Sequence, residues 1–163
     1  MKSIGTLITV SAAWVLLTAG ATAQPPPPGS LNKPGRLEWF RDQGFGLFIH
    51  WSVDSQIGSV ISRSMVGASD DYLDRFVNDL PKTFNPRKFN PVDWARLAKL
   101  AGIKYVVFTA KHHSGFAMFD TATTEFGIMH TPFKRDSTTE VLRAFREQGI
   151  APGLYFSPDD WWK

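Results

Sequence analysis

The sequence has 163 residues, no cysteine and a formal net charge of +3. Acidic and basic residues are interspersed without a basic run, so nucleic-acid binding has little support. The absence of cysteine excludes disulfides and a lipid-modified cysteine anchor.

Residues 1–23 have the pattern of a secretory signal peptide. A short basic start precedes an apolar stretch over residues 4–20 and the small-x-small sequence Ala21-Thr22-Ala23, after which we expect cleavage. A membrane anchor is the alternative, although the apolar stretch is barely long enough to span a bilayer. We therefore expect an exported protein, periplasmic or secreted, that has no membrane association once the signal is removed.

Residues 24–34 are a proline-rich linker, because their composition favours an extended chain that does not pack. The remaining sequence, residues 35–163, is long enough for one hydrophobic core. It begins with a predicted short helix over residues 37–44, where Gly44 suits the left-handed conformation that ends many helices. The apolar run over residues 45–51 predicts the first strand.

A loop rich in serine and glycine follows over residues 52–69. The spacing of apolar residues over 70–80 predicts a helix that begins at an N-cap, either Ser69 or Asp70. We expect Pro81 to end this helix.

The clearest helical pattern runs over residues 91–101, with Asn90 as N-cap and Leu97 on its apolar face. A proline at the first position of this helix fits the same interpretation. The run over residues 104–110 predicts the second strand. Its β-branched and aromatic residues are typical of a strand that is buried on both faces in a parallel sheet.

A loop over residues 121–135 leads to the capping-box pattern Ser137-Thr138-Thr139-Glu140, which predicts the start of a helix. The third strand follows over residues 151–157. Strands that alternate with helices in this way predict right-handed βαβ units, and hence an α/β fold with three parallel strands.

Three strands could form a small open sheet or the opening part of a (β/α)₈ barrel. Barrels usually need about 250 residues. The last strand here is followed by no helix that would cover it, which leaves a sheet edge unprotected. We therefore interpret the sequence as the truncated, opening part of a (β/α)₈ barrel, residues 35–163.

Three histidines lie at the carboxyl ends of predicted strands, where α/β proteins place ligand chemistry. His50 ends the first strand, and His112 and His113 follow the second. Because successive side chains of a strand point to opposite faces, the adjacent pair can share a pocket only through a bend or bulge. Neutral imidazoles both donate to and accept from hydroxyl groups, so a sugar site suits them. Core histidines bonded to the backbone are the alternative.

We expect no metal, because adjacent histidines chelate one ion poorly and the sequence has no His-x-His or His-x-x-x-His spacing. Glycine-rich phosphate loops, nucleophile elbows and metalloprotease motifs do not occur either.

Aromatic residues also lie near the strand ends. For Trp51, Trp161 and Trp162, a role in sugar stacking or in a pocket wall is balanced against simple packing. Tyr155 lies on the third strand, where its hydroxyl could reach the pocket or its ring could fill a barrel layer.

Three charged residues flank these positions. Asp159 and Asp160 are adjacent, and such pairs more often cap a helix or turn than act as a catalytic pair. Lys111 directly precedes the histidine pair and could steady a carboxylate or lie against the pocket wall.

Four segments carry a specific combined pattern: residues 45–51, 94–105, 109–116 and 153–157. The most specific is Lys111-His112-His113-Ser114-Gly115-Phe116 after a buried strand. In this order, from about residue 39 to residue 161, the segments resemble the opening barrel strands of the family 29 glycoside hydrolases, the α-L-fucosidases.

The resemblance implies a catalytic (β/α)₈ barrel that removes terminal α-L-fucose from oligosaccharides or glycoconjugates by a retaining mechanism, without a cofactor. It places the aspartate nucleophile and the acid/base beyond Lys163, so this chain alone is expected to be inactive. The residues expected to bind the substrate are His50, His112, His113, Tyr155 and Trp51.

Many members of the resembled family carry a Glu-Trp pair in the loop after the first strand, whereas residues 58–65 here lack it. The leaving-group preference is therefore expected to differ. The alternative function is a non-catalytic, fucose- or glycan-binding pseudoenzyme that kept the histidine pocket. An unrelated metal-dependent barrel hydrolase is disfavoured by the ligand spacing, and the sequence leaves the fucosyl linkage and the oligomeric state open.

Overall fold

The computed structural model describes residues 33–59 and 62–161, apart from the side chain of Pro34. The expected signal peptide, residues 1–23, and most of the expected linker lie outside the described residues. The chain divides into two compact units, Met1–Glu38 and Trp39–Lys163, and the second contains the sheet. Within the described ranges, we find no helix with the length and apolar character needed to cross a membrane.

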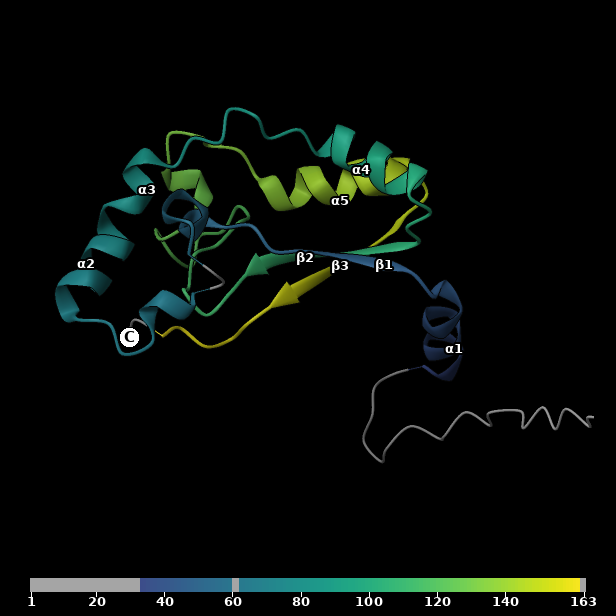
Figure 1. Cartoon of the computed structure of the whole chain (residues 1–163), viewed down its shortest axis with the longest axis horizontal. Coiled ribbons are helices and arrows are strands. Elements are labelled where there is room, and N and C mark those ends of the chain that lie inside the picture. Colours follow the sequence, from purple (N-terminus) through teal and green to yellow (C-terminus); the bar gives the residue numbers. More distant parts are fainter. Residues whose placement is uncertain (1–32, 60–61, 162–163) are drawn as a thin grey trace, which may run out of the picture. The chain divides into compact units, whose positions relative to one another are not determined.

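Three parallel strands form one sheet in the order β1-β2-β3 (Figure 1). The strands are β1 (Gly46–Ile49), β2 (Tyr105–Lys111) and β3 (Ala151–Phe156). Tyr105 pairs with Gly46 on one side and with Ala151 on the other. The strands therefore start level, and their carboxyl ends meet at one edge. The predicted α/β fold with three parallel strands is confirmed.

Helices connect the strands, and α4 and α5 lie side by side over the same face of the sheet (Figure 1). The helices are α1 (Pro34–Gln43), α2 (Asp70–Asn78), α3 (Leu80–Thr83), α4 (Pro91–Leu100) and α5 (Ser137–Glu147). The segments predicted as loops also contain short 3₁₀ helices: η1 (Val53–Ile57), η2 (Arg63–Met65) and η3 (Ile128–His130).

The predicted starts of α2 and α4 are confirmed. The Ser69 hydroxyl accepts the N–H of Tyr72, and the Asn90 side-chain oxygen accepts the N–H of Asp93, both at 3.3 Å. The prediction for Pro81 was wrong, because it lies in the first turn of α3 rather than ending the helical segment. A proline is tolerated there because the first-turn N–H has no partner inside the helix.

The start of α5 also differs from the predicted capping box. Its N-cap is Asp136, whose carboxylate accepts the N–H of Thr139 at 2.8 Å. Ser137 is fully buried and donates its hydroxyl to the carbonyl of Met118 at 2.9 Å. The serine thus ties the helix to the preceding loop, while the aspartate satisfies the N–H of Thr139 in the first turn.

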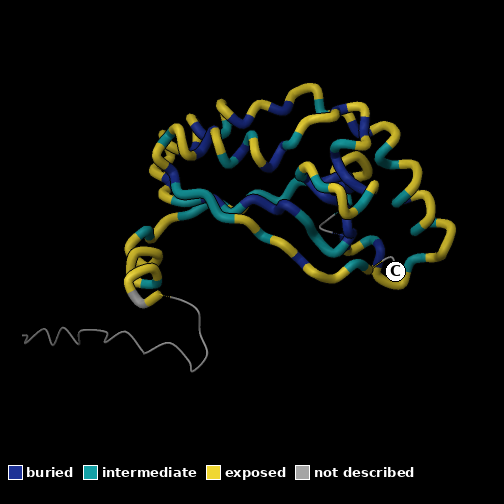
Figure 2. Tube along the Cα trace, turned by 180° about the vertical axis from the view of Figure 1, so that it is seen from behind, coloured by how far each residue is buried: buried dark blue, intermediate teal, exposed yellow. Residues whose placement is uncertain are grey.

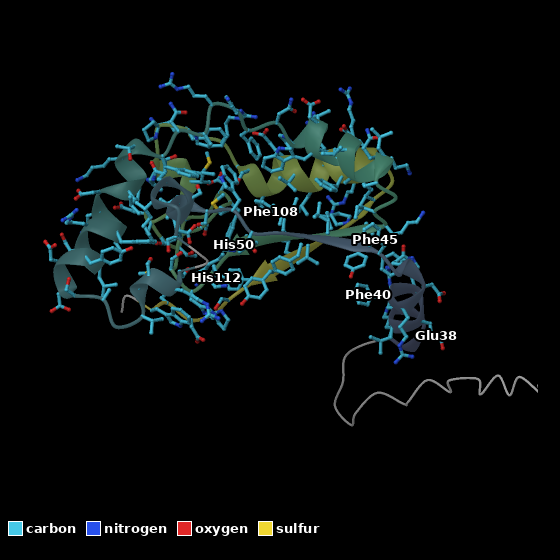
Figure 3. The ribbon with its side chains drawn as sticks, viewed as in Figure 1. Glu38, Phe40, Phe45, His50, Phe108 and His112 are labelled. Atoms are coloured by element: carbon cyan, nitrogen blue, oxygen red, sulfur yellow. The ribbon has the colours of Figure 1, made fainter. Side chains whose placement is uncertain are left out.

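The hydrophobic core lies between the sheet and the two helices that cover it. Val106 and Phe108 of β2 are fully buried, as are Val141 and Phe145 of α5. In Figure 2 buried residues alternate with exposed ones along the helices, as expected for amphipathic elements. Figure 3 shows Phe108 between the sheet and the overlying helices.

Helix α4 presents small residues to the core. Ala95 and Ala98 are buried, whereas Leu97 is 69% exposed. Leu97 borders an apolar groove between β1 and α4, which Leu47 and Ile49 also line, so it lies on the apolar face of the helix as predicted.

Candidate functional site

The carboxyl edge of the sheet places the three histidines next to one another in space. His50 directly follows β1, and His112 and His113 follow β2, where the chain turns sharply. The N–H of Gly115 donates to the carbonyl of His112 at 2.9 Å, and Gly115 adopts a φ of 82° that favours glycine.

A bulge in β2 lies just before this turn. Thr109 pairs with Tyr155 but Lys111 pairs with Phe156, so one extra residue is accommodated between the two pairs. The irregularity that the adjacent histidines require is therefore present, as a bulge followed by a tight turn.

The histidine rings form a continuous series of edge-on contacts. Ring centroids lie 5.0 Å apart for His50 and His112 and 4.5 Å apart for His112 and His113. Figure 3 shows His50 and His112 close together near the strand ends. Tyr155 of β3 stacks on His112, with centroids 5.5 Å apart. Trp161 lies flat on His113, with centroids 4.2 Å apart and planes 4° apart.

Trp51 makes its ring contacts elsewhere. It stacks on Phe89 at 5.2 Å and contacts Phe84 and Trp94. These residues belong to the hydrophobic core or pack against it. Of the two roles predicted for Trp51, packing is the better supported, and Trp161 is the tryptophan that lies against the histidines.

The surroundings of His112 favour its neutral form. Burial is the largest cause, and with the neighbouring His50 and His113 it lowers the pKa of His112 from 6.5 to about 4, while Asp54 opposes this effect. The ring is therefore uncharged at neutral pH and can offer one donor and one acceptor.

The loop after β1 returns to the histidines through two buried polar residues. Asp54 is 2% exposed, and its Oδ2 lies 3.8 Å from Nε2 of His50 and accepts the N–H of Ser62 at 3.1 Å. Ser62 is fully buried and adopts a φ of 56°. Its Oγ lies 3.1 Å from Nδ1 of His112 and accepts the N–H of Ser114 at 3.0 Å.

Neither Asp54 nor Ser62 was predicted as a site residue. Ser62 is one of several serines in a loop without periodicity, and no local signal distinguishes it.

His113 has a similar serine partner. Oγ of Ser157, directly after β3, lies 2.6 Å from Nδ1 of His113. The N–H of Trp161 donates to the carbonyl of His113 at 2.8 Å. Segment 157–161 is thus held against the turn after β2.

Lys111 also holds the segment 157–161 in place. Its Nζ forms an ion pair with Oδ1 of Asp160 at 2.6 Å and donates to the carbonyl of Ser157 at 2.9 Å. The prediction that Lys111 could steady a carboxylate is confirmed. Asp160 is held in this pair and Asp159 is exposed, so the two acidic residues have different surroundings.

Both ring nitrogens of His50 are buried and make no hydrogen bond within the described residues. Buried polar atoms are usually paired, so this ring is suited to bind a further partner such as a hydroxyl group. A small movement of the ring toward Asp54 would also give it a partner. Across residues 33–59 and 62–161, no group of three or more histidine, aspartate or glutamate side chains is placed to hold a metal ion.

Comparison with known proteins gives one consistent family. A family model described as alpha-L-fucosidase matches residues 17–163. The tissue alpha-L-fucosidase of Rattus norvegicus is 34% identical over 146 residues, which cover 81% of this chain and 32% of the rat protein. A putative alpha-L-fucosidase 1 of Oryza sativa is 33% identical, over 88% of this chain and 26% of the rice protein.

The solved structures that resemble this chain include alpha-L-fucosidases. An alpha-L-fucosidase isoenzyme 1 from Paenibacillus thiaminolyticus has a TM-score of 0.70 and 37% identity, over 77% of this chain and 29% of its own. An alpha-L-fucosidase from Bacteroides thetaiotaomicron has a TM-score of 0.70 and 32% identity, over 80% of this chain and 31% of its own. These neighbours have (β/α)₈-barrel catalytic domains, the fold class expected from the sequence.

The chain spans about a third of the rat relative and about a quarter of the rice relative, at 32% and 26% of their lengths. Because the family model matches residues 17–163, the chain belongs to the α-L-fucosidase family.

Proposed function

We propose that the protein is a retaining α-L-fucosidase, which hydrolyses terminal α-L-fucose from oligosaccharides or glycoconjugates. The observation that carries this proposal is the contact series of His50, His112 and His113 beside Tyr155, in a chain of the α-L-fucosidase family. Fucose presents neighbouring hydroxyl groups, and closely spaced neutral imidazoles can hold such groups as donors and acceptors.

The geometry supports a division of roles among the residues around the histidines. Nδ1 of His112 and of His113 each lies beside a serine hydroxyl, so Nε2 is the nitrogen left for the sugar. Trp161 is 38% exposed and lies flat on His113, which suits it to form a wall of the pocket. Contacts of this kind position the sugar and lower the barrier when they tighten in the transition state.

The catalytic carboxylates are proposed to come from outside the described residues. Near the histidines, Asp54 accepts a backbone N–H and Asp160 is paired with Lys111. Both carboxylates therefore have structural partners, which supports the expectation that the aspartate nucleophile and the acid/base lie beyond Lys163. We propose no cofactor.

The test is release of a chromogenic leaving group from an α-L-fucoside by the protein expressed from its complete reading frame. We expect His112→Ala to reduce kcat/KM at least about tenfold, because it removes a hydrogen bond to the sugar at a half-buried site. His130→Ala is the matched control, because His130 is exposed and lies in η3.

Each other outcome has a definite meaning. Release that His112→Ala leaves unchanged would contradict the assigned pocket but keep the activity. No release, combined with saturable fucose binding in calorimetry, would favour the alternative of a glycan-binding pseudoenzyme. Neither release nor binding would refute fucose as the ligand.

We also propose that the protein is exported, on the basis of the signal pattern in residues 1–23. Amino-terminal sequencing of protein recovered from the periplasm or the medium should then begin at Gln24. Protein that stays in the cytoplasm with residues 1–23 attached would contradict export.

A further inference from the structure

We propose that Ser62 and Ser157 are positioning residues, which hold His112 and His113 in the tautomer that carries its hydrogen on Nε2. Both rings then have an N–H donor at Nε2 for a further partner. The tautomers are a property of the protein alone, whereas their role toward fucose rests on the proposed function.

The hydroxyl of Ser62 contacts the ring of His112. A serine hydroxyl has one hydrogen to donate and two lone pairs to accept with. One lone pair of the Ser62 Oγ is occupied by the N–H of Ser114, at 3.0 Å. The remaining contact of this oxygen within the described residues is Nδ1 of His112, at 3.1 Å.

Only one tautomer of His112 satisfies all the groups in this contact. If Nδ1 carried the hydrogen, it would occupy the second lone pair of Ser62, and the serine's own hydrogen would have no acceptor within the described residues. Ser62 is fully buried, so an unpaired hydroxyl hydrogen there would cost free energy. If Nδ1 accepts instead, both the hydroxyl and the ring nitrogen are satisfied.

Ser157 and His113 form an equivalent contact. Ser157 is 2% exposed, and its hydroxyl has Nδ1 of His113, at 2.6 Å, as its one hydrogen-bond partner among the described residues. The serine hydrogen is therefore paired only when Nδ1 accepts it. Two buried serines, from the loop after β1 and from the end of β3, thus act in the same way on adjacent rings.

The backbone of Ser62 is a second sign that its position is functionally constrained. A φ of 56° is uncommon for a residue other than glycine, and such conformations gather at functional sites. The carboxylate of Asp54 accepts the Ser62 N–H at 3.1 Å and helps hold this conformation. Asp54 also faces His50, so one buried acid links the loop to two of the three histidines.

The neutral state that a tautomer requires is favoured at His112. The ionisable groups that face this ring are His50 after β1, Asp54 in η1, the neighbouring His113, and Tyr155 of β3. Burial, together with His50 and His113, lowers the pKa of His112 to about 4 against the effect of Asp54, so the ring is uncharged at neutral pH. One nitrogen must then carry the hydrogen, and the serine contact selects Nε2.

The direct test is ¹⁵N NMR of the protein labelled selectively at histidine, at neutral pH. The sequence has 4 histidines, so single substitutions assign every ring. We expect His112 and His113 to show an unprotonated Nδ1 and a protonated Nε2. Protonation of Nδ1 on either ring would overturn the proposal for that ring.

Variants separate the serine contact from general effects on folding. Ser62→Gly removes the hydroxyl but tolerates the positive φ, so it should fold while His112 loses its tautomer preference. Ser157→Ala should do the same at His113 alone. Ser114→Ala is the matched control, because its buried hydroxyl has no hydrogen bond within the described residues. Unchanged tautomers in Ser62→Gly would refute the role of Ser62.

A second readout concerns fucoside hydrolysis. Ser62→Gly and Ser157→Ala should each lower kcat/KM by roughly threefold to tenfold, as expected for the loss of one hydrogen bond that orients a ring. Ser114→Ala should leave it unchanged. The expected tautomers in a protein without fucosidase activity would refute the proposed function while leaving the positioning role intact.

Discussion

Replacing His112 by glutamine should flatten the dependence of protein stability on pH. In the folded protein, the pKa of His112 is lowered from 6.5 to about 4 by burial and by the neighbouring His50 and His113, against the effect of Asp54. The unfolded chain therefore binds this proton more tightly than the folded protein does. The contribution of the neutral ring is complete above about pH 6.5 and is lost as the pH falls toward 4.

The size of the effect follows from the two pKa values. The gap between them corresponds to about 3 kcal/mol, at about 1.4 kcal/mol per pH unit. The ring of His112 is only half-buried, and solvent screening reduces electrostatic energies at such sites, so we discount this figure by about half. We expect the wild type to lose about 1 to 1.5 kcal/mol more than His112→Gln between pH 7 and pH 4.5.

Urea unfolding at a series of pH values measures this difference directly. The free energy of unfolding is obtained for the wild type, His112→Gln and His130→Gln, the last serving as a control at an exposed histidine. The difference between the wild type and His112→Gln should shrink as the pH falls from 7 to 4.5. Parallel curves for these two proteins would refute the conclusion that folding keeps His112 neutral.

Three further substitutions test the fold and the anchoring of the pocket. Phe108→Ala should lower the free energy of unfolding by about 3 to 5 kcal/mol in urea titrations, because the ring is fully buried; a loss below about 1 kcal/mol would contradict its central place. Asp136→Ala should cost about 1 kcal/mol through loss of the α5 cap, whereas Asp136→Asn, which keeps a cap oxygen, should cost less; equal losses would contradict the capping role. Lys111→Met and Asp160→Asn form a double-mutant cycle, measured by thermal unfolding. Because both side chains are largely buried, the coupling energy should be about 1 kcal/mol or more; losses of stability that simply add in the double variant would refute the ion pair.

Much of the fold could be predicted from local patterns. The three strands and the helices α2, α4 and α5 have apolar spacings and end signals that lie within a few residues of one another. Predictions failed where two residues compete for one role. Asp136 rather than Ser137 caps α5, because the serine is drawn into the core by the carbonyl of Met118.

Part of the arrangement at the candidate site could be predicted from the sequence. His50, His112, His113 and Tyr155 could be located because strand ends in a parallel sheet meet at one edge. Trp51 follows His50 directly, but its ring packs with Phe89 in the core, whereas the ring of His50 contacts His112.

The sequence by itself determined the α/β order of the chain, the three strands and the placement of the histidines at their carboxyl ends. These features depend on the period of apolar residues and on end signals that act over a few residues. Only the tertiary structure brought Ser62 to His112 and Ser157 to His113, across separations of 50 and 44 residues along the chain. Such contacts carry no local pattern, because a buried serine is selected by the polar atom that it meets in the folded protein rather than by its neighbours in sequence.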